Sequence, residues 1–281
     1  MVVNCIKIAD DILLDVKNEI ANLKQEKNVY PKIVIIRLNN DLASEKYVSI
    51  KVKKAHELGV DVDVVTHLKT QDELILYLKK LNSDNKIHGY LVQLPLPNGF
   101  NQNEIFEHIS IDKDLDGLSA LATSRNFVDY RGFYPQPCTS AGIMKIIAAK
   151  KYQLSGKRVV IVNRSLIVGK PLISMLLAHD ATVTICHSKT KNLSQITNQA
   201  DVLITAIGKP NFFKKQMIKK NAFVIDAGIS VANNKIVGDV DFDQVKTQAK
   251  IITPVPNGVG KLTVAMIFVN LVNLIKNQKE N

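Results

Sequence analysis

The chain has 281 residues, of which 46% are hydrophobic and 22% are charged; this is a globular composition, and the length suffices for two domains with separate cores. A net charge of +11 favours a polyanionic partner, but the chain lacks tryptophan, zinc-finger spacing and an aromatic RNA-binding motif. Composition therefore argues against a nucleic-acid-binding protein and favours a basic surface that serves solubility or a polyanionic small molecule.

Strand and helix patterns alternate along the chain. In chain order they predict a helix at 8–23, a strand at 32–38, a helix at 43–58, a strand at 60–68, a helix at 71–81, a strand at 89–94, a helix at 139–150, strands at 158–162, 182–186, 202–207, 223–227 and 250–253, and a helix at 263–276. Alternating βα units imply parallel sheets with right-handed crossovers. We therefore expect an α/β fold with two α/β domains that divide near Cys138.

The cysteines and the N-terminal sequence indicate in which cellular compartment the protein is expected. Cys5, Cys138 and Cys186 are far apart and form no C-x-x-C motif, so neither a disulfide scaffold nor a metal site is expected. The first residues lack a basic segment followed by an apolar core, and no apolar run is expected to span a bilayer. These features predict a cytoplasmic protein with no membrane contact.

The segment RVVIVNRSLIVGKPL at 158–172 is the most informative part of the chain. A β-branched strand leads into a loop with Asn163, Arg164, Ser165 and Gly169, and Pro171 follows in the first turn of a helix. Such a unit directs backbone N–H groups and a positive helix end at an anionic ligand, although it is not a G-x-G-x-x-G motif. An ordinary strand-to-helix turn is the alternative interpretation.

The strand at 182–186 indicates which dinucleotide would bind. It ends in His187, Ser188, Lys189 and Thr190, where a site that prefers NAD usually carries an acidic residue. A cationic, hydroxyl-rich end beside Arg164 fits a 2′-phosphate instead. The residues therefore predict a dinucleotide-binding domain that prefers NADP.

Four further features are individually weak. Tyr47 and Lys51 share one helix face and could orient a proton transfer, but a surface pair is the commoner outcome of this spacing. Gln93 ends a strand before two prolines, where open α/β sheets bind ligands. Residues 112–117 resemble an Asp-rich turn, and TPVPNGVGKLT at 253–263 allows close approach of a ligand to the backbone.

Taken together and in this order, the motifs are specific. They are YVSIK at 47–51, GYLVQLPLP at 89–97, KDLDG at 113–117, PCT at 137–139, NRSLIVGKP at 163–171, CHSKT at 186–190, IGKP at 207–210, IDAGI at 225–229, GDVDF at 238–242 and TPVPNGVGKLT at 253–263. Over essentially its whole length the chain resembles the bifunctional methylenetetrahydrofolate dehydrogenase/methenyltetrahydrofolate cyclohydrolase family.

The resemblance implies a fold and an activity. A folate-binding catalytic domain would span 1–138 with a C-terminal helix at about 262–281, a Rossmann-like NADP-binding domain would span 139–261, and an active-site cleft would lie between them. The enzyme would oxidise 5,10-methylenetetrahydrofolate with NADP and hydrolyse the methenyl product to 10-formyltetrahydrofolate, which serves one-carbon metabolism and purine biosynthesis. The resemblance also implies a homodimer, no metal, and tetrahydrofolate substrates with polyglutamate tails that would suit a basic surface.

Site residues follow from the resemblance, position by position. Lys51 would act as base or proton relay, Gln93 would position it, Tyr47 would order the substrate ring, and Asp114 would hydrogen-bond the pterin. Other predicted substrate contacts are Leu94, Pro95, Pro256, Gly258 and Val259. The predicted cofactor contacts are Asn163, Arg164, Ser165, Gly169, Pro171, His187, Ser188, Ile207, Gly208, Ile229, Gly260 and Thr263.

Four positions depart from the usual family pattern. Asn163 and Asn257 replace glycines, Lys261 replaces a proline and His88 replaces an aspartate. Asn163 could crowd the pyrophosphate, or it could turn its side chain away and use a φ that asparagine accepts. The departures leave open an enzyme that is mainly a cyclohydrolase with weak dehydrogenase activity. Two alternatives come from other classes of protein. A non-catalytic NADP-binding regulator would require loss of the Lys51, Gln93 and Asp114 set, which is intact, and a nucleic-acid-binding protein is suggested by charge alone.

Overall fold

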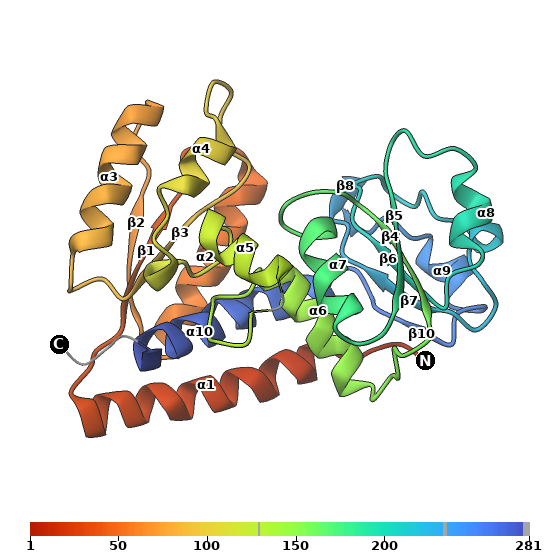
Figure 1. Cartoon of the computed structure of the whole chain (residues 1–281), viewed down its shortest axis with the longest axis horizontal. Coiled ribbons are helices and arrows are strands. Elements are labelled where there is room, and N and C mark those ends of the chain that lie inside the picture. Colours follow the sequence, from red (N-terminus) through yellow and green to blue (C-terminus); the bar gives the residue numbers. More distant parts are fainter. Residues whose placement is uncertain (129, 233–234, 278–281) are drawn as a thin grey trace. The chain divides into compact units, whose positions relative to one another are not determined.

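The computed structural model describes residues 1–128, 130–232 and 235–277. The chain forms two compact units: unit 1 comprises Met1–Asp10, Asn126–Asp129 and Pro137–Met266, and unit 2 comprises Asp11–Arg125, Tyr130–Gln136 and Ile267–Asn281. Each unit contains a parallel sheet with flanking helices (Figure 1). This arrangement confirms the predicted two-domain α/β fold.

The sheet of unit 2 has the strand order β2-β1-β3, with β1 at Lys32–Ile36, β2 at Asp61–Val65 and β3 at Gly89–Val92. All pairings are parallel, and the register joins Ile36 to both Val65 and Val92. The carboxyl ends of the three strands are therefore aligned. The segments that follow β1 and β3 leave the sheet at the same edge, where side chains from distant parts of the sequence can meet.

Helices connect and cover these strands. Helix α2 (Leu42–Glu57) joins β1 to β2, and α3 (Gln71–Ser83) joins β2 to β3, beginning with a capping box of Thr70 and Glu73. Beyond β3 come α4 (Gln102–Glu107), the 3₁₀ turn η1 (Ile111–Lys113) and α5 (Ala120–Phe127). The residues after η1 run beside β3, because Leu115 N–H donates to Tyr90 O at 3.1 Å.

Unit 1 contains a five-stranded parallel sheet in the order β10-β7-β6-β4-β5. Its strands are β4 (Arg158–Val162), β5 (Thr182–Cys186), β6 (Val202–Thr205), β7 (Phe223–Asp226) and β10 (Ile251–Ile252). Figure 1 shows α7 (Gly169–Leu177) on one side of this sheet and α8 (Leu193–Thr197) and α9 (Phe242–Val245) on the other. Val160, Leu203 and Val224 pack with the α8 and α9 side into one apolar core, so the sheet is buried on both faces as the β-branched runs predict.

Several element boundaries differ from the predicted ones. The strands at 158–162 and 182–186 match, whereas β2 ends at Val65 and β6 at Thr205. Helix α1 (Cys5–Lys27) is longer than predicted, and α6 (Cys138–Ala149) begins one residue earlier. The prediction did not include α4, α5, or the antiparallel hairpin of β8 (Ser230–Ala232) and β9 (Lys235–Val237).

Helix α10 (Val259–Asn277) corrects the expectation that no segment is long and apolar enough to span a membrane. Its 19 residues satisfy that criterion by length and composition alone. However, 67% of its most apolar window is buried inside the protein, as in the core helix of a globular domain. The helix is therefore weak support for a membrane-spanning segment.

Candidate functional site

The carboxyl edge of the unit 2 sheet brings Lys51 and Gln93 together. Lys51 lies on α2, one turn after Tyr47, and is only 6% exposed. Its Nζ donates to Gln93 Oε1 at 2.9 Å, while Gln93 Nε2 donates to the carbonyl of Leu94 at 2.7 Å. The second hydrogen bond orients the Gln93 amide, so its oxygen faces the amine. A buried amine held by an oriented amide is suited to moving a proton.

Tyr47 is half-buried on the same helix. Burial raises the pKa of its phenol above the ordinary value, so the hydroxyl stays protonated at neutral pH and remains a hydrogen-bond donor. The helix that carries both residues is capped by Asp41, whose carboxylate accepts the Ser44 N–H at 2.7 Å. The cap and the helical spacing together position Tyr47 and Lys51.

Asn39 is a member of this edge that the sequence analysis missed. It follows β1, and its Nδ2 donates to the carbonyl of Pro95, two residues beyond Gln93. Its Oδ1 is buried and has no hydrogen-bond partner among the described residues. Leu94 and Pro95, both predicted substrate contacts, form a cis peptide bond in this turn. An asparagine directly after a buried strand is the signal that could have identified it.

Asp114 lies deeper than the resemblance suggests, since its side chain is only 1% exposed. Its carboxylate accepts the N–H groups of Asp116, Gly117 and Ser119, at 3.2, 2.8 and 2.6 Å. Burial, which outweighs these hydrogen bonds, raises the pKa of Asp114 to about 6. Asp114 therefore organises its own loop, and its contact with a pterin stays a prediction.

The predicted cofactor residues of unit 1 meet at the carboxyl edge of its sheet. The register joins Val162 to Cys186 and to Thr205, so the segments beginning at 163, 187 and 206 leave from one edge. They carry Asn163, Arg164 and Ser165, then His187 and Ser188, then Ile207 and Gly208.

The chemistry of this edge suits a phosphorylated dinucleotide. Arg164, Ser188 and Lys189 are exposed and can donate to a phosphate group. Gly169 begins α7 so close to Asn163 that an added Cβ would lie 2.1 Å from its carbonyl oxygen. The glycine is therefore required for the tight approach of the loop to the helix, and Pro171 follows in the first helical turn.

Two buried acids behind this edge were not predicted. Asp239 accepts the N–H groups of Ile207 and Lys209, and Asp226 accepts those of Gly228 and Val240. Burial raises the pKa of both carboxyls, that of Asp226 to about 6. The motifs IDAGI and GDVDF contain these acids, but their partners are distant in the sequence.

The remaining predicted residues of unit 1 lie in or near the loop before α10. Pro256 is cis, Asn257 has φ +68°, and a Cβ at Gly258 would lie 1.9 Å from the Pro254 carbonyl oxygen. Val259 and Gly260 begin α10, and Thr263 donates to the Val259 carbonyl at 3.3 Å. Ile229 is 42% exposed just before β8.

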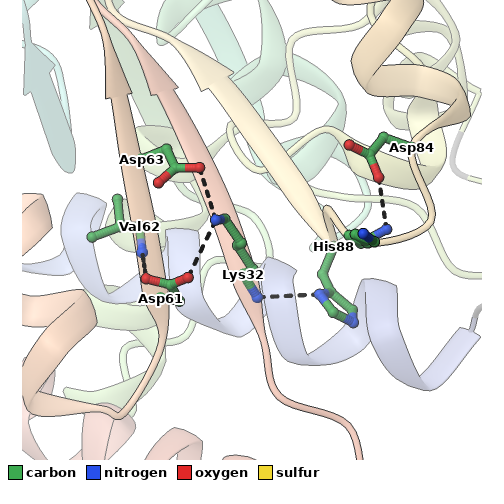
Figure 2. Close-up of polar contacts among 7 residues, drawn as sticks. Lys32, Asp61, Val62, Asp63, Asp84 and His88 are labelled. Atoms are coloured by element: carbon green, nitrogen blue, oxygen red, sulfur yellow. Dashed lines mark hydrogen bonds and ion pairs between the residues drawn. The ribbon is translucent and has the colours of Figure 1, made fainter.

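Lys261 and His88 account for the other departures from the usual pattern. Lys261 is exposed in the first turn of α10. His88 Nδ1 accepts the backbone N–H of Lys32 at 3.1 Å, and Lys32 Nζ reaches Asp61 and Asp63 (Figure 2). This cluster lies at the amino ends of β1, β2 and β3, and His88 is roughly 17 Å from Gln93 along β3 at about 3.3 Å per residue. His88 therefore has a structural role, as an acceptor that an aspartate could also supply.

No metal centre accompanies these edges. Within residues 1–128, 130–232 and 235–277, no group of three or more His, Cys, Asp or Glu side chains is arranged to hold a metal ion.

Comparisons with known proteins identify the chain. Residues 3–116 match the catalytic domain of the tetrahydrofolate dehydrogenase/cyclohydrolase family, and residues 137–279 match its NAD(P)-binding domain. A protein of Malacoplasma penetrans named "Bifunctional protein FolD" is 53% identical over 98% of both chains.

Solved structures agree. The bifunctional dehydrogenase/cyclohydrolase of Campylobacter jejuni superposes with a TM-score of 0.93 at 38% identity, covering 99% of both chains. The Trypanosoma brucei enzyme, solved with NADP cofactor and an inhibitor, gives 0.94 at 31% identity, covering 100% of this chain and 99% of the other. With both domains matched in order and along nearly the whole length, the chain belongs to the tetrahydrofolate dehydrogenase/cyclohydrolase family.

Proposed function

We propose that the Lys51–Gln93 pair is the hydrolytic centre of this bifunctional folate enzyme. The enzyme oxidises 5,10-methylenetetrahydrofolate to 5,10-methenyltetrahydrofolate with NADP and hydrolyses that product to 10-formyltetrahydrofolate. The observation that carries the proposal is the 2.9 Å hydrogen bond between a lysine that is 6% exposed and an oriented glutamine.

The hydrolytic step requires a proton acceptor. Water adds to the cationic methenyl carbon, a C–O bond forms, and the neutral amine of Lys51 accepts one proton from the water. The bond from that carbon to N5 then breaks as Lys51 returns the proton to N5, and the hydroxyl proton leaves to solvent. One proton is released overall, and the formyl group remains on N10. Gln93 keeps the amine directed at the reacting carbon throughout.

Tyr47 and Asp114 support this centre in different ways. The protonated hydroxyl of Tyr47 would order the substrate ring from the same face of α2. Asp114 would shape the loop at 114–119, whose edge faces the substrate in this proposal. Leu94, Pro95, Pro256, Gly258 and Val259 would complete the substrate contacts.

The proposed binding site for NADP lies at the carboxyl edge of the unit 1 sheet. NADP, when bound, supplies the acceptor for the hydride that leaves the one-carbon unit. Arg164 and Ser188 would hold the 2′-phosphate through charge-assisted hydrogen bonds. The loops at 163–169 and 206–209 would contact the rest of the dinucleotide.

Residues 1–138 with 262–281 would form the folate domain and residues 139–261 the NADP domain. The matched family domains, at 3–116 and 137–279, support a boundary near Cys138. The assignment of the C-terminal helix to the folate domain is supported by its residues from Ile267, which belong to unit 2. We further propose that the enzyme is a cytoplasmic homodimer that supplies formyl groups for purine biosynthesis. Polyglutamate tails on the folate would suit the net charge of +11.

Lys51→Met tests the division of labour. The variant should lose hydrolysis of methenyltetrahydrofolate, measured by its absorbance, and retain part of the NADP-dependent oxidation, which needs no base. Lys54→Met, on the same helix beside Glu57, is the matched control and should keep both activities. Equal loss of both activities in a folded Lys51→Met protein would contradict the assigned role. Slow oxidation by the wild type would favour the enzyme that is mainly a cyclohydrolase.

A further inference from the structure

The side chain of Asn163 closes the loop between β4 and α7. Its Oδ1 accepts from Ser165 N–H at 2.7 Å, from Ser165 Oγ at 2.7 Å and from Gly169 N–H at 3.0 Å. Ser165 Oγ in turn accepts the Val168 N–H at 3.2 Å. The loop therefore carries an internal hydrogen-bond network built on one asparagine.

The same side chain reaches a second loop. Asn163 Nδ2 donates to the carbonyl of Ala206, the first residue beyond β6. The next residues of that loop are held from the other side, because Asp239 accepts the N–H groups of Ile207 and Lys209. Asn163 thus links two segments that leave neighbouring strands at the carboxyl edge of the sheet.

These contacts distinguish between the two interpretations of this departure from glycine. Asn163 has no positive φ, so backbone freedom is not what the residue supplies. Its oxygen accepts three hydrogen bonds and its amide donates a fourth, which folds the side chain into the loop and away from an incoming ligand. The arrangement does not support crowding of the pyrophosphate.

The network also satisfies donors at the start of α7. The N–H groups of Val168 and Gly169 already donate to Ser165 and Asn163. In many dinucleotide sites such N–H groups donate hydrogen bonds to the phosphate. In this chain they hold the loop, so recognition of the anion shifts toward the exposed side chains of Arg164, Ser188 and Lys189.

We propose that Asn163 is a positioning residue for the cofactor: it holds the loops at 163–169 and 206–209 in their binding conformation before NADP arrives. The proposal rests on the assignment of NADP to this edge. Ordering two loops in advance lowers the entropy lost on binding, so the expected benefit is in affinity rather than in the rate of the bound complex.

Two variants of Asn163 remove the hydrogen-bond network, and a third variant, at another position, is the control. Asn163→Ala deletes all four hydrogen bonds, and Asn163→Gly installs the residue usual in the family. Asn198→Ala removes a comparable side-chain-to-backbone hydrogen bond, to Gln216 O at 2.8 Å, in the same unit but outside both loops. Loss of these four part-buried hydrogen bonds should weaken NADP binding by about tenfold in the Asn163 variants, and the control should match the wild type.

The measurements separate positioning from general stability. Calorimetric titration gives the Kd for NADP, and steady-state assays should show a raised KM for NADP with kcat within about twofold and hydrolysis unchanged. Hydrogen exchange of peptides covering 163–169 and 206–209 should be faster in the free variants and return to the wild-type rate with saturating NADP.

The outcomes are distinct. NADP affinity equal to that of the wild type in both Asn163 variants would overturn the positioning role, and tighter binding would overturn it and favour crowding. Unchanged exchange in the free variants would also overturn it. If the wild type itself bound no NADP, the cofactor assignment would fail, whereas wild-type binding with unaffected variants would reject only the role of Asn163.

Discussion

Replacing Asp114 with asparagine changes how the stability of the protein depends on pH. Burial raises the pKa of this carboxyl from 3.8 to about 6, so between these values the folded state keeps a proton that the unfolded chain has released. Because the folded state binds more protons, this contribution to the unfolding free energy is greatest below pH 3.8 and is lost as pH rises through about 6.

The size of this contribution follows from the difference between the two pKa values. At about 1.4 kcal/mol per pKa unit, the difference corresponds to a loss of about 3 kcal/mol of unfolding free energy between acid and neutral pH. Asparagine has no charge to bury, but its amide nitrogen would face Ser119 N–H, which now donates to the carboxylate at 2.6 Å. Leaving that donor unpaired costs about 1–3 kcal/mol at every pH. Asp114→Asn should therefore be less stable than wild type by about 1–3 kcal/mol near pH 4, and equal to it or more stable by up to about 2 kcal/mol above pH 7.

Urea unfolding followed by far-ultraviolet circular dichroism, from pH 4 to 8, measures this difference. Asp112→Asn, at an exposed position in η1, is the matched control, and its profile should run parallel to that of the wild type. A constant difference between Asp114→Asn and wild type across the pH range would refute the argument that the buried carboxyl titrates near pH 6.

Three other predictions concern single side chains. Arg164→Ala should raise the KM for NADP far more than that for NAD, whereas a wild type that already prefers NAD would contradict the phosphate assignment. Asn257→Ala should lower the unfolding free energy by roughly 1–2 kcal/mol in thermal unfolding, because alanine disfavours the φ of +68°, and Asn257→Gly should not. His88→Ala should cost about 1 kcal/mol above pH 6.5 by leaving Lys32 N–H without its acceptor, and both activities should persist. Since burial lowers the pKa of His88, this contribution is present above 6.5 and lost as pH falls through the lowered value, so an unaltered difference at acid pH would count against it.

Local patterns predicted the elements that carry the chemistry. The β-branched run before Asn163 specifies a buried strand, and Gly169 and Pro171 mark the start of α7, so that unit is predictable almost residue by residue. Helical spacing likewise places Tyr47 and Lys51 on one face. The partnership of Lys51 with Gln93 follows from the family resemblance, because residues 42 positions apart share no local pattern.

Long-range polar networks escaped the sequence analysis for a physical reason. Asp226 and Asp239 hold loops that follow other strands, and nothing near them in the sequence indicates which backbone N–H groups donate to their carboxylates. Asn39 is similar, since its partner Pro95 is 56 residues away. Short helices such as α4 also depend on tertiary packing more than on propensity. Their existence could not be read from periodicity alone.

Asn257 and Asn163 both stand where the family usually has glycine, yet the two replacements have different physical reasons. At Asn257 the backbone keeps a φ of +68°, so the position still requires what glycine supplies, and asparagine is among the few residues that tolerate it. At Asn163 φ is not positive, and the side chain itself has acquired partners in two loops. Tolerance of unusual φ therefore explains the first replacement but not the second. Restoring glycine should then be nearly neutral at 257 and should weaken NADP binding at 163.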